Sequence, residues 1–203
     1  MSNFSKEKTY ALFDSVNNKK TMVQLSAENI ETIIFPLITT ISLTTPETET
    51  LLKNLNNFDW LVFPDVYAAE FFIENLTKFG IDLFELDSLR VCACGEAIAD
   101  RLRFSQLHSD VIPPVINTLD VLQSIRDYVF EQDKFENLRF LIISGNEYND
   151  ELSDELESLK SYVMNLPVYT FEIADKSEIP KLKALLKGGA IDEFIFSSQF
   201  DVI

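Results

Sequence analysis

Two short stretches of the chain place polar residues directly after a run of apolar ones. Residues 59–65 read Asp-Trp-Leu-Val-Phe-Pro-Asp, and residues 192–198 read Asp-Glu-Phe-Ile-Phe-Ser-Ser. Each pattern predicts a buried β-strand that ends abruptly in a turn. Ligands of open α/β sheets collect at the carboxyl ends of the strands. Asp65, Ser197 and Ser198 are therefore candidate binding residues.

Two further strand-to-helix turns are able to offer backbone N–H groups to an anion. Their residues are Gly95, Glu96 and Ala97 in the first turn, and Ser144, Gly145 and Asn146 in the second. A helix N-terminus has free amides and a partial positive charge, so each turn is a candidate carboxylate cradle. A glycine in such a turn is also a common structural feature. Likewise, Ser197 and Ser198 suit plain helix capping as well as ligand binding.

Cysteine and histidine are scarce, with two Cys and one His in 203 residues. A zinc site needs about four ligands, usually of these two types, so we expect no metal site. Cys92 and Cys94 lie two positions apart on a predicted strand and face the same side. We interpret them as buried free thiols of a cytoplasmic protein.

The chain is strongly acidic, with a formal net charge of −16. Such a charge opposes binding to DNA, RNA or an anionic membrane. The apolar runs are too short to span a bilayer, and no signal peptide opens the chain. We therefore expect no nucleic-acid partner and no membrane partner. The same charge opposes an anionic small molecule unless the binding cleft is locally positive.

Strands and helices alternate regularly through the middle of the chain. Strands are predicted at residues 59–63, 89–94, 111–112, 138–143 and 162–169, with helices at 66–79, 96–104, 118–130 and 150–160. Alternation of this kind indicates βαβ units and a largely parallel sheet.

Two polar segments divide the chain into an α/β protein of two parallel-sheet, flavodoxin-like lobes. Residues 40–58, which begin with a stretch of mostly Thr, Ser, Pro and Glu, are predicted to be a linker into a second lobe at 59–169, and residues 170–177 a second linker. The first lobe is then discontinuous, built from residues 1–39 and 178–203, and the two linkers form a hinge. A further βαβ unit of about 30 residues is expected beyond residue 203, so we expect an incomplete first lobe.

Five segments resemble, in order, those of the uroporphyrinogen-III synthase family. Residues 59–63 and 192–198 resemble its Asp-x-hydrophobic-Phe-Thr-Ser strand ends. Residues 91–102 are similar to its strand-Gly-x-x-Thr-Ala-x-x-Leu segment, and residues 141–152 to a later strand-x-Gly turn. Residues 166–169 resemble the strand before its hinge, which ends in a Tyr.

The resemblance implies a lyase of tetrapyrrole biosynthesis that uses no metal and no cofactor. Such an enzyme cyclises hydroxymethylbilane, a linear polycarboxylate tetrapyrrole, while inverting the last pyrrole ring. Tyr169 matches the family's hinge-side Tyr and would donate to the departing hydroxyl. Its other interpretation is an aromatic residue packed at a lobe edge. The strand-end turns would hold substrate carboxylates, and we expect a monomer.

Several residues depart from the family pattern. Ile98 replaces a Thr, Pro64 and Asp65 replace Thr-Ser, and Ser144 and Asn149 stand where the family often has basic residues. A second hypothesis is therefore a non-catalytic relative that binds a tetrapyrrole or a protein partner. A phosphate-binding receiver or nucleotide domain is less favoured, because neither a P-loop nor G-x-G-x-x-G is present.

Overall fold

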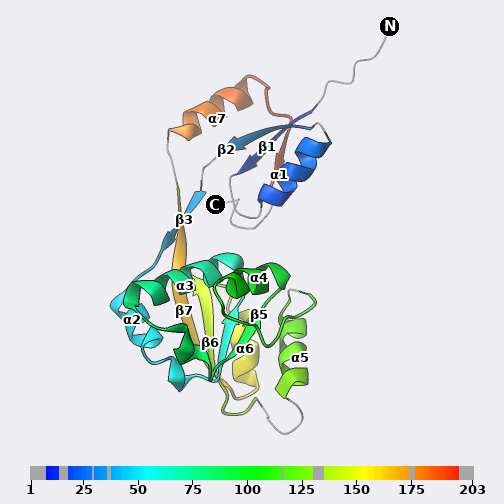
Figure 1. Ribbon diagram of the computed structural model, residues 1–203. Coiled ribbons are helices and arrows are strands. Elements are labelled where there is room, and N and C mark those ends of the chain that lie inside the picture. The colour runs from blue at the N-terminus through cyan, green and yellow to red at the C-terminus, as the bar shows by residue number, and fades with distance from the viewer. Residues whose placement is uncertain are drawn as a thin grey trace. The chain divides into compact units, whose positions relative to one another are not determined.

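The computed structural model describes residues 8–13, 18–28, 30–35, 38–115, 117–129, 135–173 and 177–196. The chain forms two compact units, which Figure 1 displays. Unit 1 comprises Met1–Ile41 and Phe171–Ile203, and unit 2 comprises Ser42–Thr170. Both contain parallel sheets with helices, so the predicted α/β class is confirmed. No described helix is both long enough and apolar enough to cross a bilayer.

The sheet of unit 2 is built on a fully buried central strand. The sheet has the spatial order β3 (Ile38–Ser42), β7 (Tyr162–Ile173), β6 (Arg139–Gly145), β4 (Trp60–Phe63) and β5 (Arg90–Ala93). Residues 38–41 of β3 and 171–173 of β7 belong to unit 1. The pairs β4–β5, β4–β6 and β6–β7 are all parallel. Every side chain of β4 is buried, as expected for a parallel strand with helices on both faces.

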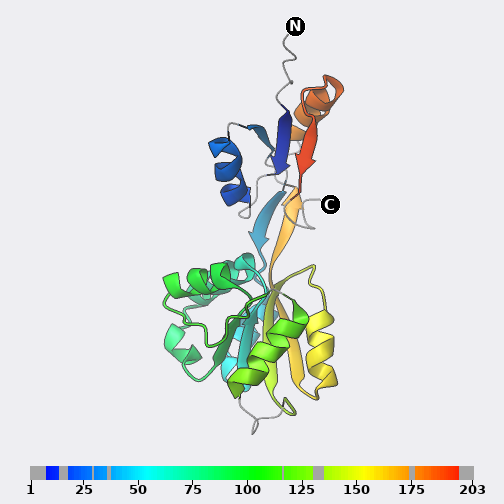
Figure 2. The ribbon, with the colours of Figure 1, turned by 90° about the vertical axis from the view of Figure 1, so that its right-hand side faces the viewer.

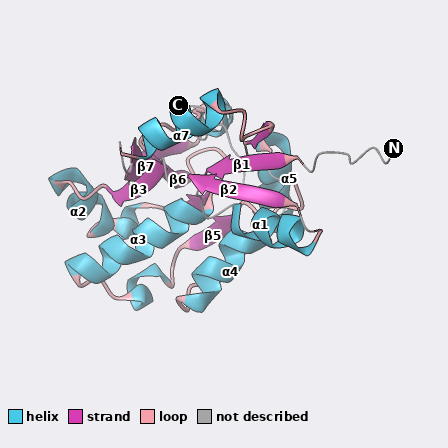
Figure 3. Ribbon diagram, turned by 90° about the horizontal axis from the view of Figure 1, so that it is seen from above, coloured by secondary structure: helices cyan, strands magenta, loops and turns pink. Residues whose placement is uncertain are grey.

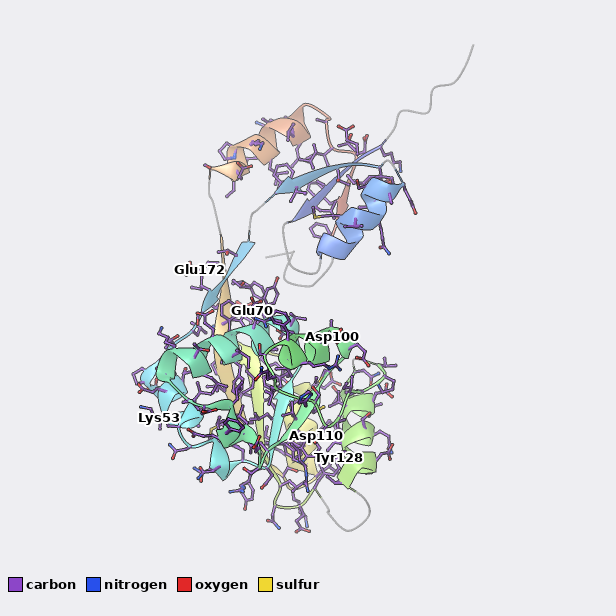
Figure 4. The ribbon with its side chains drawn as sticks, in the orientation of Figure 1. Lys53, Glu70, Asp100, Asp110, Tyr128 and Glu172 are labelled. Atoms are coloured by element: carbon purple, nitrogen blue, oxygen red, sulfur yellow. The ribbon has the colours of Figure 1, made fainter. Side chains whose placement is uncertain are left out.

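Helices cover both faces of this sheet. Figure 2 shows α3 (Val66–Phe79) and α4 (Glu96–Phe104) on one face, with α5 (Thr118–Val129) and α6 (Glu151–Ser158) on the other. α3 and α4 run side by side (Figure 3). Glu70, which Figure 4 labels on α3, has its Oε1 3.7 Å from Arg101 Nη2 of α4. α3 buries Phe72 edge-on against Phe63, with 5.2 Å between the ring centroids.

The strand order creates a topological switch point in unit 2. From β4 the chain passes to β5 on one side and later returns to β6 on the other side of β4. The two connections leave the carboxyl ends of β4 and β6 in opposite directions, which opens a crevice between them. Ligands of open α/β sheets bind in that crevice.

The start of unit 2 has more structure than the predicted linker. It contains the end of β3, helix α2 (Pro46–Leu52) and the 3₁₀ helix η1 (Leu55–Asn57). Thr45 caps α2, because its hydroxyl accepts the amide of Thr48, and Pro46 occupies the first turn. A Thr-Pro-Glu start is a helix signal that overrides a polar composition.

Other boundaries also differ from the sequence pattern. β7 continues to Ile173, into the predicted second linker. The short strand predicted at residues 111–112 is a single bridge between Cys92 and Val111. Asp110 beside it accepts a hydrogen bond from the Tyr128 phenol at 3.0 Å (Figure 4) and, at its other carboxyl oxygen, one from the Val91 amide at 2.7 Å, so that it joins α5 to β5. A 3₁₀ helix, η2 (Leu83–Leu86), precedes β5.

Unit 1 has a three-stranded parallel sheet in the order β2-β1-β8. Its elements are β1 (Thr9–Phe13), α1 (Asn18–Ala27), β2 (Glu31–Phe35), α7 (Glu178–Lys187) and β8 (Glu193–Ile195). Ala11 and Phe35 are fully buried, and Leu182 and Leu185 of α7 pack against them. The candidate residues Ser197 and Ser198 lie outside the described part of the chain.

Candidate functional site

Asp65 and Tyr169 meet at the carboxyl end of the unit 2 sheet. Asp65 follows β4 and caps α3, because its Oδ1 accepts the amide of Ala68 at 2.8 Å. Its other carboxyl oxygen, Oδ2, accepts a hydrogen bond from the Tyr169 phenol at 2.9 Å. Two residues 104 positions apart in the chain are thereby joined at the switch point.

Gly145 makes room for the ring of Tyr169. The two residues are partners across β6 and β7. A Cβ atom on Gly145 would lie 2.8 Å from Tyr169 Cζ, closer than side chains pack. The amide of Asn146 donates to the carbonyl of Tyr169 at 2.8 Å, which fixes the turn against β7. The ring is also flanked by Tyr67 and Phe71 of α3, at centroid distances of 5.5 and 5.8 Å.

Burial changes the acid–base properties of this pair. It raises the pKa of Asp65, although the amide of Ala68 and the phenol of Tyr169 partly oppose that effect. The pKa of Tyr169 is also raised, first by burial and then by the nearby charge of Asp65. A phenol that points at a carboxylate keeps its proton, since losing it would place two negative charges together.

Tyr148 is a further aromatic residue of this region, which the sequence analysis missed. Its pKa is raised by burial first, and then by Cys94, Asp150 and Asp65, whose charges act on it. It belongs to the polar loop that follows β6. One aromatic residue within a run of Asn and Glu, directly after a strand end, is the signal that could have revealed it.

A pocket of about 350 Å³ lies at the same ends of the strands. Pro64 and Cys94 form its strand side, and Tyr148 contributes from the loop after β6. Its other lining residues belong to α5 and the α6 region, namely Asn117, Thr118, Val121, Asn149, Glu151 and Leu152. The volume is at the lower end of the range for small-molecule sites. The pocket begins one residue from Asp65.

The other predicted anion cradles are less well formed. Gly95 adopts a φ of 126°, which favours glycine, and its amide already donates to Ala93 O at 2.7 Å. Glu96 and Ala97 are exposed in the first turn of α4. The Glu96 charge there opposes a second carboxylate. Ile98, which replaces the family's Thr, is a buried core residue of α4.

Ser144 lies near the Asp65–Tyr169 pair but has a different environment. Its side chain is 1% exposed, and its hydroxyl has no hydrogen-bond partner among the described residues. Its neighbour Gly145 faces Tyr169. The register of the β6–β7 pairing shifts between Ser144 and Gly145.

A larger pocket, of about 760 Å³, lies at the opposite end of the sheet. It is lined by Arg139 at the start of β6 and by Tyr162 and Met164 at the start of β7, together with residues that follow β3. None of the predicted site residues lines it. Among the described residues, no group of three or more His, Cys, Asp or Glu side chains is placed to hold a metal ion. Cys92 and Cys94 are both buried and unbridged.

The fold and the strand-end site define a two-unit parallel α/β protein with a candidate ligand crevice. Comparison with known protein families matches residues 19–202 to the family described as uroporphyrinogen-III synthase HemD. The chain therefore belongs to the uroporphyrinogen-III synthase family, as its sequence motifs predicted. A search of curated protein sequences gives no match.

Solved structures show the same fold at low sequence identity. A mutant uroporphyrinogen III synthase from Thermus thermophilus has a TM-score of 0.65 and 16% identity, covering 92% of this chain and 71% of its own. The wild-type Thermus thermophilus enzyme has a TM-score of 0.57 and 17% identity, covering 96% and 74%. The Helicobacter pylori enzyme has a TM-score of 0.56 and 13% identity, covering 96% and 75%.

Proposed function

We propose that this protein is a uroporphyrinogen-III synthase, which closes hydroxymethylbilane into uroporphyrinogen III with inversion of the terminal pyrrole ring. The observation that carries the proposal is the position of the Tyr169 phenol, which a hydrogen bond to Asp65 holds at the switch point of the sheet. The chain also belongs to the uroporphyrinogen-III synthase family. The protein would act in the cytoplasm, as a monomer, without metal or cofactor.

The site would hold the substrate in a reactive conformation and would donate one proton to it. Loss of the substrate hydroxyl leaves a stabilised cation on the linear tetrapyrrole, and protonation of that hydroxyl makes it a better leaving group. Tyr169 is the proposed proton donor. The pocket of about 350 Å³, which neither Asp65 nor Tyr169 lines, is too small for a whole linear tetrapyrrole and would hold only one end of it.

Carboxylate binding is proposed at the turns around this pocket. The amides of Glu96 and Ala97, in the first turn of α4 after Gly95, would face a substrate carboxylate. Ser144, Gly145, Ser197 and Ser198 stay proposed carboxylate-binding residues, of which Ser197 and Ser198 lie outside the described part of the chain. The acidic surface opposes such binding, so each contact would rely on backbone amides rather than on net charge.

The proposal is tested by supplying the purified protein with enzymatically generated hydroxymethylbilane. We expect uroporphyrinogen III, separated from the spontaneous isomer I by chromatography. Formation of isomer I alone would contradict the proposed activity. That result, combined with saturable binding of a linear tetrapyrrole, would instead support a non-catalytic binding module, which the buried Ile98, Asp65 in place of a hydroxyl residue and the acidic net charge favour.

A further inference from the structure

The hydrogen bond between Tyr169 and Asp65 places a restriction on any proton transfer at this site. The phenol donates its proton to Asp65 Oδ2. If Asp65 is ionised, a phenol that gives its proton to a substrate becomes a phenolate 2.9 Å from a carboxylate. Two like charges at that distance cannot both be accommodated where Tyr169 is only 1% exposed. Tyr169 alone is therefore a poor acid while Asp65 carries a charge.

We infer that Asp65 and Tyr169 act as one proton-donating pair, in which the protonated carboxyl of Asp65 supplies the proton that Tyr169 passes to the leaving hydroxyl. This inference rests on the proposed function. The carboxyl O–H of Asp65 donates to the phenol oxygen, while the phenol O–H protonates the substrate hydroxyl. The C–O bond breaks, and its electron pair leaves with water. The products are a neutral phenol, the Asp65 carboxylate, water and the substrate cation.

The pair has the surroundings that this role needs. Burial raises the pKa of Asp65, which favours its neutral form before the reaction. Among the described residues, the titratable side chains with a ring contact or an electrostatic effect on the pair include Tyr67 from α3 and Tyr148 from the loop after β6, with Cys94 beside Tyr148 at the end of β5. None of these three is basic. After the transfer, the Asp65 carboxylate is left close to the new cation and stabilises it electrostatically.

A protonated Asp65 would also remove the expected repulsion between this residue and an anionic substrate. A charged Asp at this strand end would repel a polycarboxylate substrate, whereas a neutral carboxyl does not. Substrate binding and proton delivery would therefore require the same protonated form. Both are lost as the pH rises through the apparent pKa of the pair.

The first test is the pH dependence of uroporphyrinogen III formation. The wild-type rate is expected to be constant at low pH and to fall as Asp65 ionises. Asp65→Asn keeps a good helix cap but holds no acidic proton. We therefore expect its rate to be at least about tenfold lower than that of the wild type, and its rate no longer to fall as the pH rises. Asp65→Ser is a second variant that keeps the cap. Asp82→Asn, at the exposed cap of η2, is the matched control and should retain the wild-type profile. Unchanged rate and profile in Asp65→Asn would overturn the inference.

The second test does not need activity. The Asp65 carboxyl carbon is followed by ¹³C NMR against pH and assigned with Asp65→Asn. We expect it to titrate above the ordinary Asp value of about 3.9. Tyr169→Phe should move it higher still, because the lost phenol had stabilised the carboxylate. An Asp65 that titrates with the surface carboxylates and does not respond to Tyr169→Phe would contradict the pair. If the wild type makes no isomer III, the proposed function fails, and this titration still decides whether the two residues share a proton.

Discussion

At the scale of single residues, the ring of Tyr169 occupies the space where a side chain at position 145 would lie. Replacing Gly145 by Ala places a methyl group 2.8 Å from the ring. We expect the ring to shift, with a loss of about 1–3 kcal/mol in the free energy of unfolding and a matching loss of activity. Chemical denaturation measures the first and isomer III formation the second. Gly80→Ala is the control, because its left-handed φ of 65° costs stability but its Cβ meets nothing within 4 Å. A Gly145→Ala protein with wild-type stability and activity would contradict this packing.

Asp59 joins the amino ends of β4 and β6 through Arg139. Its carboxylate accepts hydrogen bonds from Arg139 Nε at 3.1 Å and Nη2 at 2.8 Å, and from the Arg139 amide at 2.8 Å. The pKa of Asp59 is lowered, and the side-chain hydrogen bonding to Arg139 is the largest cause. The contribution to stability is therefore present above the unfolded pKa of about 3.9, and it is lost as the pH falls through the lower folded pKa.

Asp59→Ala is accordingly expected to lose about 1 kcal/mol of unfolding free energy at neutral pH, since the pair is partly exposed. As the pH falls through the lowered folded pKa of Asp59, the difference between variant and wild type should shrink toward zero. Urea denaturation at several pH values measures this. Asp100→Ala, which removes an exposed ion pair with Arg103, is the control and should change little. A pH-independent difference for Asp59→Ala would contradict the assignment.

At the scale of elements, the cap of α2 depends on Thr45. Its hydroxyl accepts the amide of Thr48 at 3.1 Å, and Thr48 Oγ1 accepts the amide of Thr45 at 3.3 Å. Thr45→Ala should cost about 1 kcal/mol in unfolding free energy, whereas Thr45→Ser should cost little. Thr50→Ala removes only a hydroxyl bonded to Pro46 O within the helix and serves as control. Equal stability of the Ala and Ser variants at residue 45 would show that the cap contributes nothing.

The elements of unit 2 could be predicted from the sequence because their signals are local. The apolar run at residues 60–63, Asp65 as a cap and Gly80 as a C-terminal stop define β4 and α3. Helix α2 was missed because polar Thr and Glu residues conceal a short amphipathic turn. Its start lies in a capping box rather than in hydrophobic periodicity.

The candidate site could be predicted only in part. Strand-end position identified Asp65 and Gly145, and the family motif identified Tyr169. Their contact, however, depends on strand order, since β6 lies between β4 and β7. The sequence spacing does not predict that a phenol and a carboxyl 104 residues apart form a hydrogen bond. The role of Gly145 as space for a ring is equally a property of the packed sheet.

At the scale of the whole molecule, the two units have cores of different size. Within the described residues, unit 1 buries few side chains fully, namely Ala11, Leu12 and Phe35, whereas unit 2 buries the two faces of its sheet. The single Trp of the chain, Trp60, is buried in unit 2. Tryptophan fluorescence therefore reports on unit 2 alone.

The unfolding transitions recorded by two different probes should consequently occur at different urea concentrations. In urea, we expect circular dichroism to record an early transition from unit 1 that Trp60 fluorescence does not record. The fluorescence change should follow at higher urea concentration. Superimposable curves from the two probes would contradict independent units.

The central claim is that the strand-end site of unit 2 performs the chemistry, with Tyr169 as its proton donor. The most direct measurement is the rate of uroporphyrinogen III formation from hydroxymethylbilane by the wild type, Tyr169→Phe and Tyr162→Phe. Tyr162 begins the same strand, is 65% exposed and lies at the opposite end of the sheet. We predict a loss on the order of 10²-fold for Tyr169→Phe and a wild-type rate for Tyr162→Phe. A wild-type rate in Tyr169→Phe would contradict the account.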